Sequence, residues 1–165
     1  MTLRFGSLWA ALAIAVLLTC GCATAPRSAG PAAQPADVWN GRLALRVESE
    51  QVQSFSAAFE LKGNARAGEL ALYSPFGATI ARLSWSPGVA LLRSDGKEQA
   101  FDSLDALTRQ ATGAELPITS IFLWLAGEDA SAQGWTADLR RLAQGRLEAR
   151  RSVPAPAMEL RLVLD

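Results

Sequence analysis

The 165-residue sequence contains no histidine and only two cysteines. Without histidine it lacks the commonest metal ligand and the usual general base, and it cannot build a Ser-His-Asp or Cys-His catalytic arrangement. It also lacks an excess of either charge, because 16 Lys and Arg residues balance 16 Asp and Glu residues. Nucleic-acid binding needs a surplus of basic residues on one face. We therefore expect no nucleic-acid partner, no metal and, since no glycine-rich phosphate loop is present, no cofactor.

The N-terminus has the pattern of a lipoprotein signal peptide. The charge at Arg4 precedes an apolar run over residues 8–18, which is short for a membrane span. Small residues then lead to Cys22, which we expect to be lipidated after removal of residues 1–21. Cys20 fits this pattern less well because a threonine precedes it. An ordinary secretory signal with incidental cysteines is the alternative.

Residues 22–37 are rich in alanine and proline and contain almost no bulky side chains. Such a segment cannot bury a core, so we predict a flexible tether that precedes a folded domain of residues 38–165. Ala23 follows the expected lipidation site, where an aspartate commonly marks retention at the inner membrane of Gram-negative cells. We therefore expect a protein that is anchored at the outer membrane through Cys22 and faces the periplasm.

Alternating apolar and polar side chains predict strands over much of residues 38–101. The segments follow one another with short connections, including a hairpin turn at Asp95 and Gly96. This order indicates an antiparallel meander. The alternation resumes in residues 134–142, 145–151 and 158–165. Strands therefore dominate the folded part.

Two helices interrupt the strands. The first is predicted between an N-cap at Ser103 and a stop at Gly113. The second begins near Pro117, ends at Gly127 and is apolar on nearly all sides, so it must be covered on more than one side. Two short helices are a thin cover for so many one-sided strands. Either the curved sheet closes into a packed barrel, or it surrounds a space that something else fills.

Several stretches, in this order, resemble the LolB family of outer-membrane lipoprotein receptors. They are WNGRLALRV (39–47), FSAAFELKG (55–63), GELALYSPFGATIARLSW (68–85), ELPITSIFLWLAG (115–127), GW (134–135) and ELRLVLD (159–165). The resemblance implies a mainly β fold, a half-closed antiparallel barrel with a short-helix lid over an apolar cavity. It also implies a monomer that accepts lipoproteins from the periplasmic chaperone LolA and inserts them into the inner leaflet of the outer membrane, without covalent catalysis.

The apolar strand faces and the second helix supply the candidate lining of an acyl-chain cavity. Each of these residues could equally pack a dry core, because a period of two identifies a face and not a cavity. The candidates are Leu43, Leu45, Phe55, Phe59, Leu70, Leu72, Leu83, Trp85, Leu91, Ile121, Phe122 and Leu125.

A turn in the first half of the domain carries an apolar side chain at its tip. Pro75 and Gly77 flank Phe76, so the backbone presents this side chain on a rigid turn. An aromatic ring in such a place suits a membrane interface. The resemblance to LolB implies that Phe76 occupies the place of an exposed apolar residue needed to deliver cargo into the membrane. The alternative is a side chain that folds back over the sheet edge.

Two other functions compete with the receptor hypothesis. The first is a structural or assembly lipoprotein with a solidly packed barrel, whose surface binds other envelope proteins. The second is a lipid-modifying enzyme that uses Ser74, Asp95 and Asp105. The absence of histidine and of a G-x-S-x-G nucleophile elbow argues against the enzyme.

Overall fold

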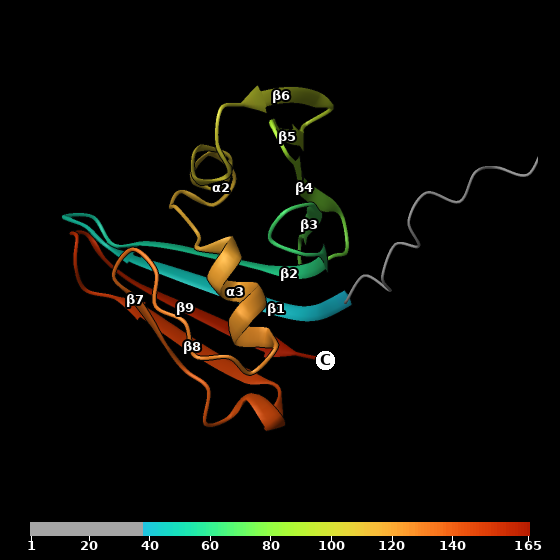
Figure 1. Ribbon diagram of the computed structural model, residues 1–165. Helices are drawn as coiled ribbons and strands as arrows, with labels where there is room; N and C mark the ends of the chain where they lie inside the picture. Colours follow the sequence, from blue (N-terminus) through green and yellow to red (C-terminus); the bar gives the residue numbers. More distant parts are fainter. Residues whose placement is uncertain (1–37) are drawn as a thin grey trace, which may run out of the picture. The chain divides into compact units, whose positions relative to one another are not determined.

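The computed structural model describes residues 38–165, which fold as a curved antiparallel sheet with two helices (Figure 1). These residues belong to one compact unit. The predicted signal peptide, the lipidation site at Cys22 and the tether lie outside the described residues, so these remain predictions.

Nine strands form a single sheet in the order β6-β5-β4-β3-β2-β1-β9-β8-β7. Every pairing is antiparallel, which confirms the predicted meander. The C-terminal strand β9 pairs with β1, so the second group of strands extends the sheet from its first strand. The strands are β1 (Val38–Glu48), β2 (Gln53–Gly63), β3 (Gly68–Tyr73), β4 (Thr79–Ser86), β5 (Val89–Ser94), β6 (Lys97–Phe101), β7 (Trp135–Asp138), β8 (Arg146–Arg151) and β9 (Ala157–Leu164).

Helix α2 (Leu104–Thr112) has the ends that its sequence predicts. The Ser103 side chain accepts a hydrogen bond from the Ala106 N–H at 3.1 Å, which satisfies one of the free donors of the first turn. Gly113 adopts a left-handed conformation, and its N–H donates to the Arg109 carbonyl. The helix packs against β4, β5 and β6.

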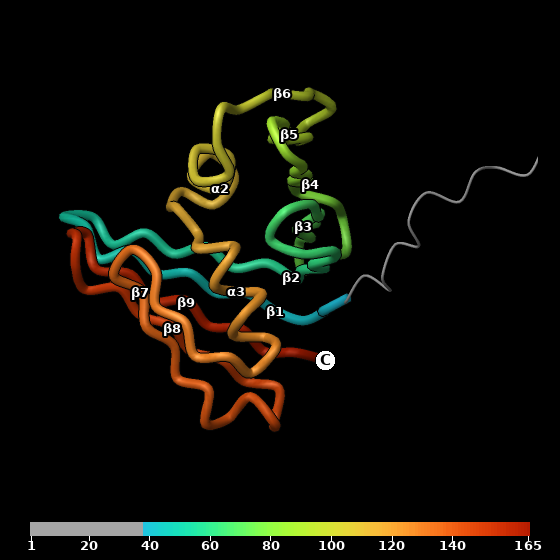
Figure 2. The backbone as a smooth tube through the Cα atoms, in the orientation of Figure 1, coloured from blue at the N-terminus to red at the C-terminus, as the bar shows by residue number. Residues whose placement is uncertain are grey.

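Helix α3 (Ile118–Leu125) follows Pro117 and has no side-chain cap. Nearly all of its side chains are buried, as its apolar character on several sides requires. The sheet bends so that β3–β6 turn away from β1, β2 and β9, and both helices lie on its concave side (Figures 1 and 2). Strands β6 and β7 are the two ends of the sheet, which confirms an incomplete barrel.

The segment after β7 differs from the prediction, because the alternation over residues 134–142 predicts one long strand. Strand β7 ends at Asp138, whose carboxylate accepts hydrogen bonds from the backbone N–H and the guanidinium of Arg140. Such a local side-chain bond favours a turn over strand pairing. A short 3-10 helix, Leu142–Gln144, follows. Among residues 38–165, no helix has the length and apolar character needed to cross a bilayer.

Candidate functional site

The inner face of the sheet and both helices share one hydrophobic core. Alternate residues of β1, β2, β4, β8 and β9 point into this core. Apolar and polar side chains therefore alternate along the sequence of these strands. Because β1 and β9 are neighbours, the core runs continuously from the first hairpin to the last.

Most of the predicted lining residues are buried in this core, and their role in binding acyl chains remains a prediction. Phe55 is only half-buried, although it packs against the cluster. The buried ones are Leu43, Leu45, Phe59, Leu70, Leu72, Leu83, Trp85, Ile121, Phe122 and Leu125.

Leu91 lies elsewhere. It alternates with Ala90 and Leu92, which are the buried residues of β5, and it pairs with Ser84 on the other face of the sheet. The sequence places two leucines side by side at this point, so the period of two has no single phase. Leu92 therefore belongs to the core in place of Leu91.

The predicted lining also omits the contribution of the C-terminal strands. Leu147, Leu160 and Leu162 are almost fully buried in the same cluster. The alternation of apolar and polar residues in these strands predicts that they lie on a buried face. Their membership in the core nevertheless depends on the pairing of β9 with β1, a contact between distant parts of the chain.

An aromatic cluster joins α3 to both parts of the sheet. The ring of Phe122 meets Trp39 of β1 edge-on at 5.5 Å between centroids and meets Trp85 of β4 at 6.2 Å. Trp85 is itself fixed, since its indole N–H donates to the Asn64 carbonyl at 3.0 Å. A Cβ atom at Gly68 would lie 2.6 Å from the Trp85 ring, so glycine leaves the space that the ring needs. These contacts hold α3 against the concave face.

Several side chains of the hydrophobic core are completely buried. Leu72, Leu83 and Trp124 have no solvent-accessible surface. A side chain without such surface borders no void large enough for water. The Trp124 indole is also satisfied, because it donates to the Ala130 carbonyl at 2.6 Å.

The hairpin between β3 and β4 is a well-formed turn. The Gly77 N–H donates to the Ser74 carbonyl at 2.9 Å, and the Ser74 N–H donates to the Ala78 carbonyl at 2.8 Å. Serine, proline and glycine stand at the first, second and fourth positions that a type I turn prefers. Gly77 has a φ of +81°, which an L side chain rarely adopts. Phe76 at this tip is 98% exposed.

A groove of about 650 Å³ lies on the outer face of the sheet beside this hairpin. Small side chains from β1 and β2 form part of its floor, and the hairpin forms one wall. Arginines from β1 and β9 also border it. The residues around the groove are Arg42, Leu43, Ala44, Ser56, Ala57, Ala58, Tyr73, Ser74, Pro75, Gly77, Arg161 and Val163. Within residues 38–165, no group of three or more Cys, Asp or Glu side chains could hold a metal ion.

Comparison with known proteins identifies the family. The family model described as "Outer membrane lipoprotein LolB" matches residues 38–155. The chain belongs to the LolB family. The LolB match begins with β1, contains the Phe76 hairpin and α3, and ends between β8 and β9.

Curated relatives carry the same name. An outer-membrane lipoprotein LolB of Bordetella petrii is 33% identical over 144 residues, which cover 84% of this chain and 70% of the relative. One from Thiobacillus denitrificans is 29% identical over 168 residues, with 88% and 89% covered. One from Chromobacterium violaceum is 32% identical over 122 residues, with 70% of this chain and 65% of the relative covered.

Proposed function

We propose that this protein is an outer-membrane lipoprotein receptor. It accepts lipoproteins from a LolA-like periplasmic chaperone and inserts them into the inner leaflet of the outer membrane. One observation carries the proposal in this LolB family member. An apolar interior beneath a short helix is combined with a rigid hairpin whose phenylalanine is 98% exposed. The first feature suits the binding of acyl chains, and the second suits contact with a bilayer.

The energy of an acyl chain in water determines how transfer must occur. Burial stabilises a hydrocarbon chain by about 0.8 kcal/mol per methylene group, hence on the order of 12 kcal/mol for a chain of about sixteen carbons. Free lipoprotein in water is therefore too costly as an intermediate. The receptor must take the chains directly from the carrier into its own apolar interior.

Helix α3 is the element that we expect to move. Its buried side chains hold it through apolar contacts, which have no fixed direction and which an acyl chain can replace. It is short, and no side-chain hydrogen bond caps its first turn. Displacement of α3 would expose the inner leucines of the sheet to the incoming chains.

The lipid anchor at Cys22 would keep the receptor at the membrane, and residues 22–37 would give it reach. Within the described part of the chain, the core is assembled from residues 43–162. A form with Cys22→Ala behind a cleavable secretory signal should therefore fold and still accept cargo. Circular dichroism of this soluble form tests the tether, since loss of folded structure would contradict it.

The exposed phenylalanine would act in delivery. Burial of a phenylalanine side chain in lipid contributes roughly 1.5–3 kcal/mol, which is too little to anchor the protein but enough to favour docking. We expect Phe76→Glu to accept lipoprotein from the chaperone at the parent rate and to deliver it poorly to liposomes. Phe76→Leu should deliver almost normally. The measurement follows labelled lipoprotein from the purified chaperone complex to the receptor and then to liposomes.

Each outcome has a separate meaning. If the Glu variant delivers as fast as the parent, Phe76 is an ordinary surface residue. If it fails to accept cargo, Phe76 acts at the entrance of the binding site. If the parent takes no lipoprotein from the chaperone, the receptor function is wrong.

The complete burial of several core side chains favours one rival, a structural lipoprotein with a solidly packed barrel. An environment-sensitive apolar dye separates the two. The receptor should bind the dye saturably at low stoichiometry, and lipoprotein should displace it. A packed barrel should bind none.

A further inference from the structure

The outer face of the sheet carries charges in rows that cross the strands. In an antiparallel sheet, paired residues on adjacent strands point to the same side. The register places three of the outer rows on β1, β2 and the C-terminal strands. The first is Tyr73, Ala58, Arg42, Val163 and Arg146; the second is Ser56, Ala44, Arg161, Glu148 and Asp138; the third is Ser54, Arg46, Glu159, Arg150 and Thr136.

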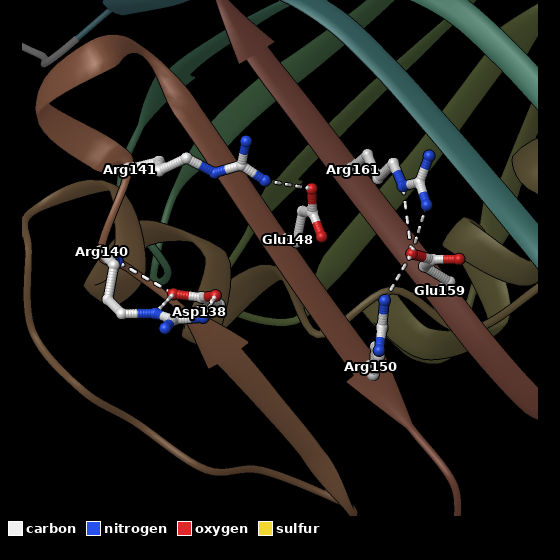
Figure 3. Close-up of polar contacts among 7 residues, drawn as sticks. All are labelled: Asp138, Arg140, Arg141, Glu148, Arg150, Glu159 and Arg161. Atoms are coloured by element: carbon white, nitrogen blue, oxygen red, sulfur yellow. Dashed lines mark hydrogen bonds and ion pairs between the residues drawn. The ribbon is translucent and has the colours of Figure 1, made fainter.

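Carboxylates compensate the arginines of the second and third rows. Arg161 and Arg150 meet at the Glu159 carboxylate, at 2.8 and 3.3 Å (Figure 3). Arg46 lies 3.6 Å from Glu48 at the end of β1. Figure 3 also shows Glu148 and Asp138 with arginines of the segment after β7. These two rows offer little free positive charge to a partner.

The first row is different. Within residues 38–165, neither Arg42 nor Arg146 forms an ion pair, although both are exposed. Val163 lies between them and is 47% exposed. The nearest carboxylates of the next row do not pair with these arginines: Glu60 pairs with Lys62, and Asp165, whose N–H donates to the Asn40 carbonyl, forms no ion pair with either arginine. The row therefore combines two uncompensated positive charges with an apolar side chain.

This row also begins at the base of the hairpin. Tyr73 is its first member and the last residue of β3, and the Phe76 tip follows three residues later. Strands lie about 4.8 Å apart, so Arg42 is two strands, on the order of 10 Å, from the hairpin strand. Arg42, Tyr73 and Val163 all border the groove beside the hairpin. Arg42 and the Phe76 hairpin thus border one groove, and Arg146 lies in the same row, two strands beyond Arg42.

We propose that this row is a phospholipid docking surface, on which Arg42 and Arg146 bind headgroup phosphates while Phe76 enters the acyl region. The proposal deepens the function above and rests on it. A guanidinium suits phosphate because its fork of N–H donors matches two phosphate oxygens. The groove of about 650 Å³ beside Arg42 has the size of a small-molecule site and gives room for a headgroup. The arginines would set the orientation of the hairpin toward the leaflet.

The test measures binding of the cargo-free soluble form, Cys22→Ala behind a cleavable signal, to vesicles that contain phosphatidylglycerol. A basic residue near an anionic surface changes binding by about fivefold. We therefore expect Arg42→Gln and Arg146→Gln each to weaken vesicle binding about fivefold, and the double variant on the order of 25-fold. Arg42→Lys should retain most of the binding, and high salt should abolish the difference between variants.

Arg150→Gln is the matched control, because it removes the same charge from the same face but from an ion pair with Glu159. We expect the vesicle affinity of this variant to lie within about twofold of the parent affinity, because exposed ion pairs contribute little free energy. Equal losses in the control and in Arg42→Gln would overturn the proposal in favour of a general charge effect. Parent-like binding by the double variant, or no vesicle binding by the parent, would also overturn it.

Inorganic phosphate in place of vesicles should give no detectable binding. Tight phosphate binding that Arg42→Gln removes would replace the lipid surface with a free-anion site. The vesicles contain neither chaperone nor lipoprotein, so this result stands apart from the transfer assay. If the arginine variants bind as the parent while Phe76→Glu still fails in delivery, the docking surface is wrong and the receptor function stands.

Discussion

Phe76 and Phe122 are the same type of residue, but one is exposed to solvent and the other is buried in the core. Phe76 stands on a hairpin tip and is 98% exposed, whereas Phe122 on α3 is 7% exposed and touches two tryptophans. Burial of an aromatic side chain is explained by core packing alone. Core packing does not explain an aromatic side chain that is exposed on a rigid turn, because a polar residue at this tip would allow the protein to fold equally well.

The difference separates stability from delivery. We expect the inner region to carry folding energy and, when α3 moves, acyl chains. We expect the hairpin to carry almost no folding energy and to act at the membrane. Substitutions in the inner region should therefore change the free energy of unfolding, whereas substitutions in the hairpin should change delivery with little effect on stability.

The largest expected effect comes from truncation of the two phenylalanines. Phe122→Ala should lower the free energy of unfolding by about 3 kcal/mol, since it removes a buried ring and leaves a cavity. Phe76→Ala should change it by less than about 0.5 kcal/mol, because the ring has no packing to lose. Urea unfolding followed by circular dichroism measures both. Similar losses in the two variants would show that the hairpin packs against the domain in solution.

A second prediction concerns the one buried charged residue among residues 38–165. Arg151 on the inner face of β8 is 6% exposed, and its guanidinium carbon lies 5.9 Å from the centroid of the Trp135 ring. Within the described residues, the Arg151 Nε and the Trp135 indole N–H have no hydrogen-bond partner. A buried N–H without a hydrogen-bond partner costs free energy that an apolar side chain avoids.

Arg151→Met should therefore stabilise the fold by about 1 kcal/mol, the net of lost desolvation cost and lost cation–π attraction. Arg150→Met, one residue earlier on the outer face, is the control and should be close to neutral. Thermal and urea unfolding compare the two. A clear loss of stability in Arg151→Met would mean that a group outside the described residues, or a bound ligand, satisfies the guanidinium.

The sequence predicted most of the fold because its signals are local. Alternation identified the strands, and the residues at Ser103 and Gly113 defined the ends of α2. The pairing of β9 with β1 had no such signal, since it joins distant segments. Leu91 was assigned to the wrong face because adjacent leucines fit either phase.

The candidate site also combines features that local sequence predicts with features that depend on contacts between distant segments. Pro75 and Gly77 revealed the turn that exposes Phe76, because turn chemistry is local. The groove beside the hairpin depends on small residues such as Ala44 and Ser56 on neighbouring strands, so no single segment predicts it. Alternation identifies the apolar face of each strand but does not specify how α3 packs on that face, because this packing joins distant segments.

The smallest expected effect lies on the charged outer face, at Glu159. The Arg161 guanidinium, and after it Arg150, stabilise this carboxylate and lower its pKa below the ordinary value. A depressed folded-state pKa stabilises the protein above the unfolded-state pKa, and this contribution is lost as the pH falls through the folded-state pKa. Glu159→Gln should therefore cost roughly 0.5 kcal/mol at neutral pH, given the exposure of both arginines.

The cost should shrink as the pH falls below the ordinary glutamate pKa of about 4.3, because the contribution is lost between this unfolded-state value and the lower folded-state pKa of Glu159. Urea unfolding across this range measures the difference between parent and variant. High salt should reduce the difference at neutral pH, because exposed pairs are screened. A difference that persists unchanged in acid would show that Glu159 stabilises β9 by packing or uncharged hydrogen bonds. The outer face would then resemble the inner one more closely than its ion pairs indicate.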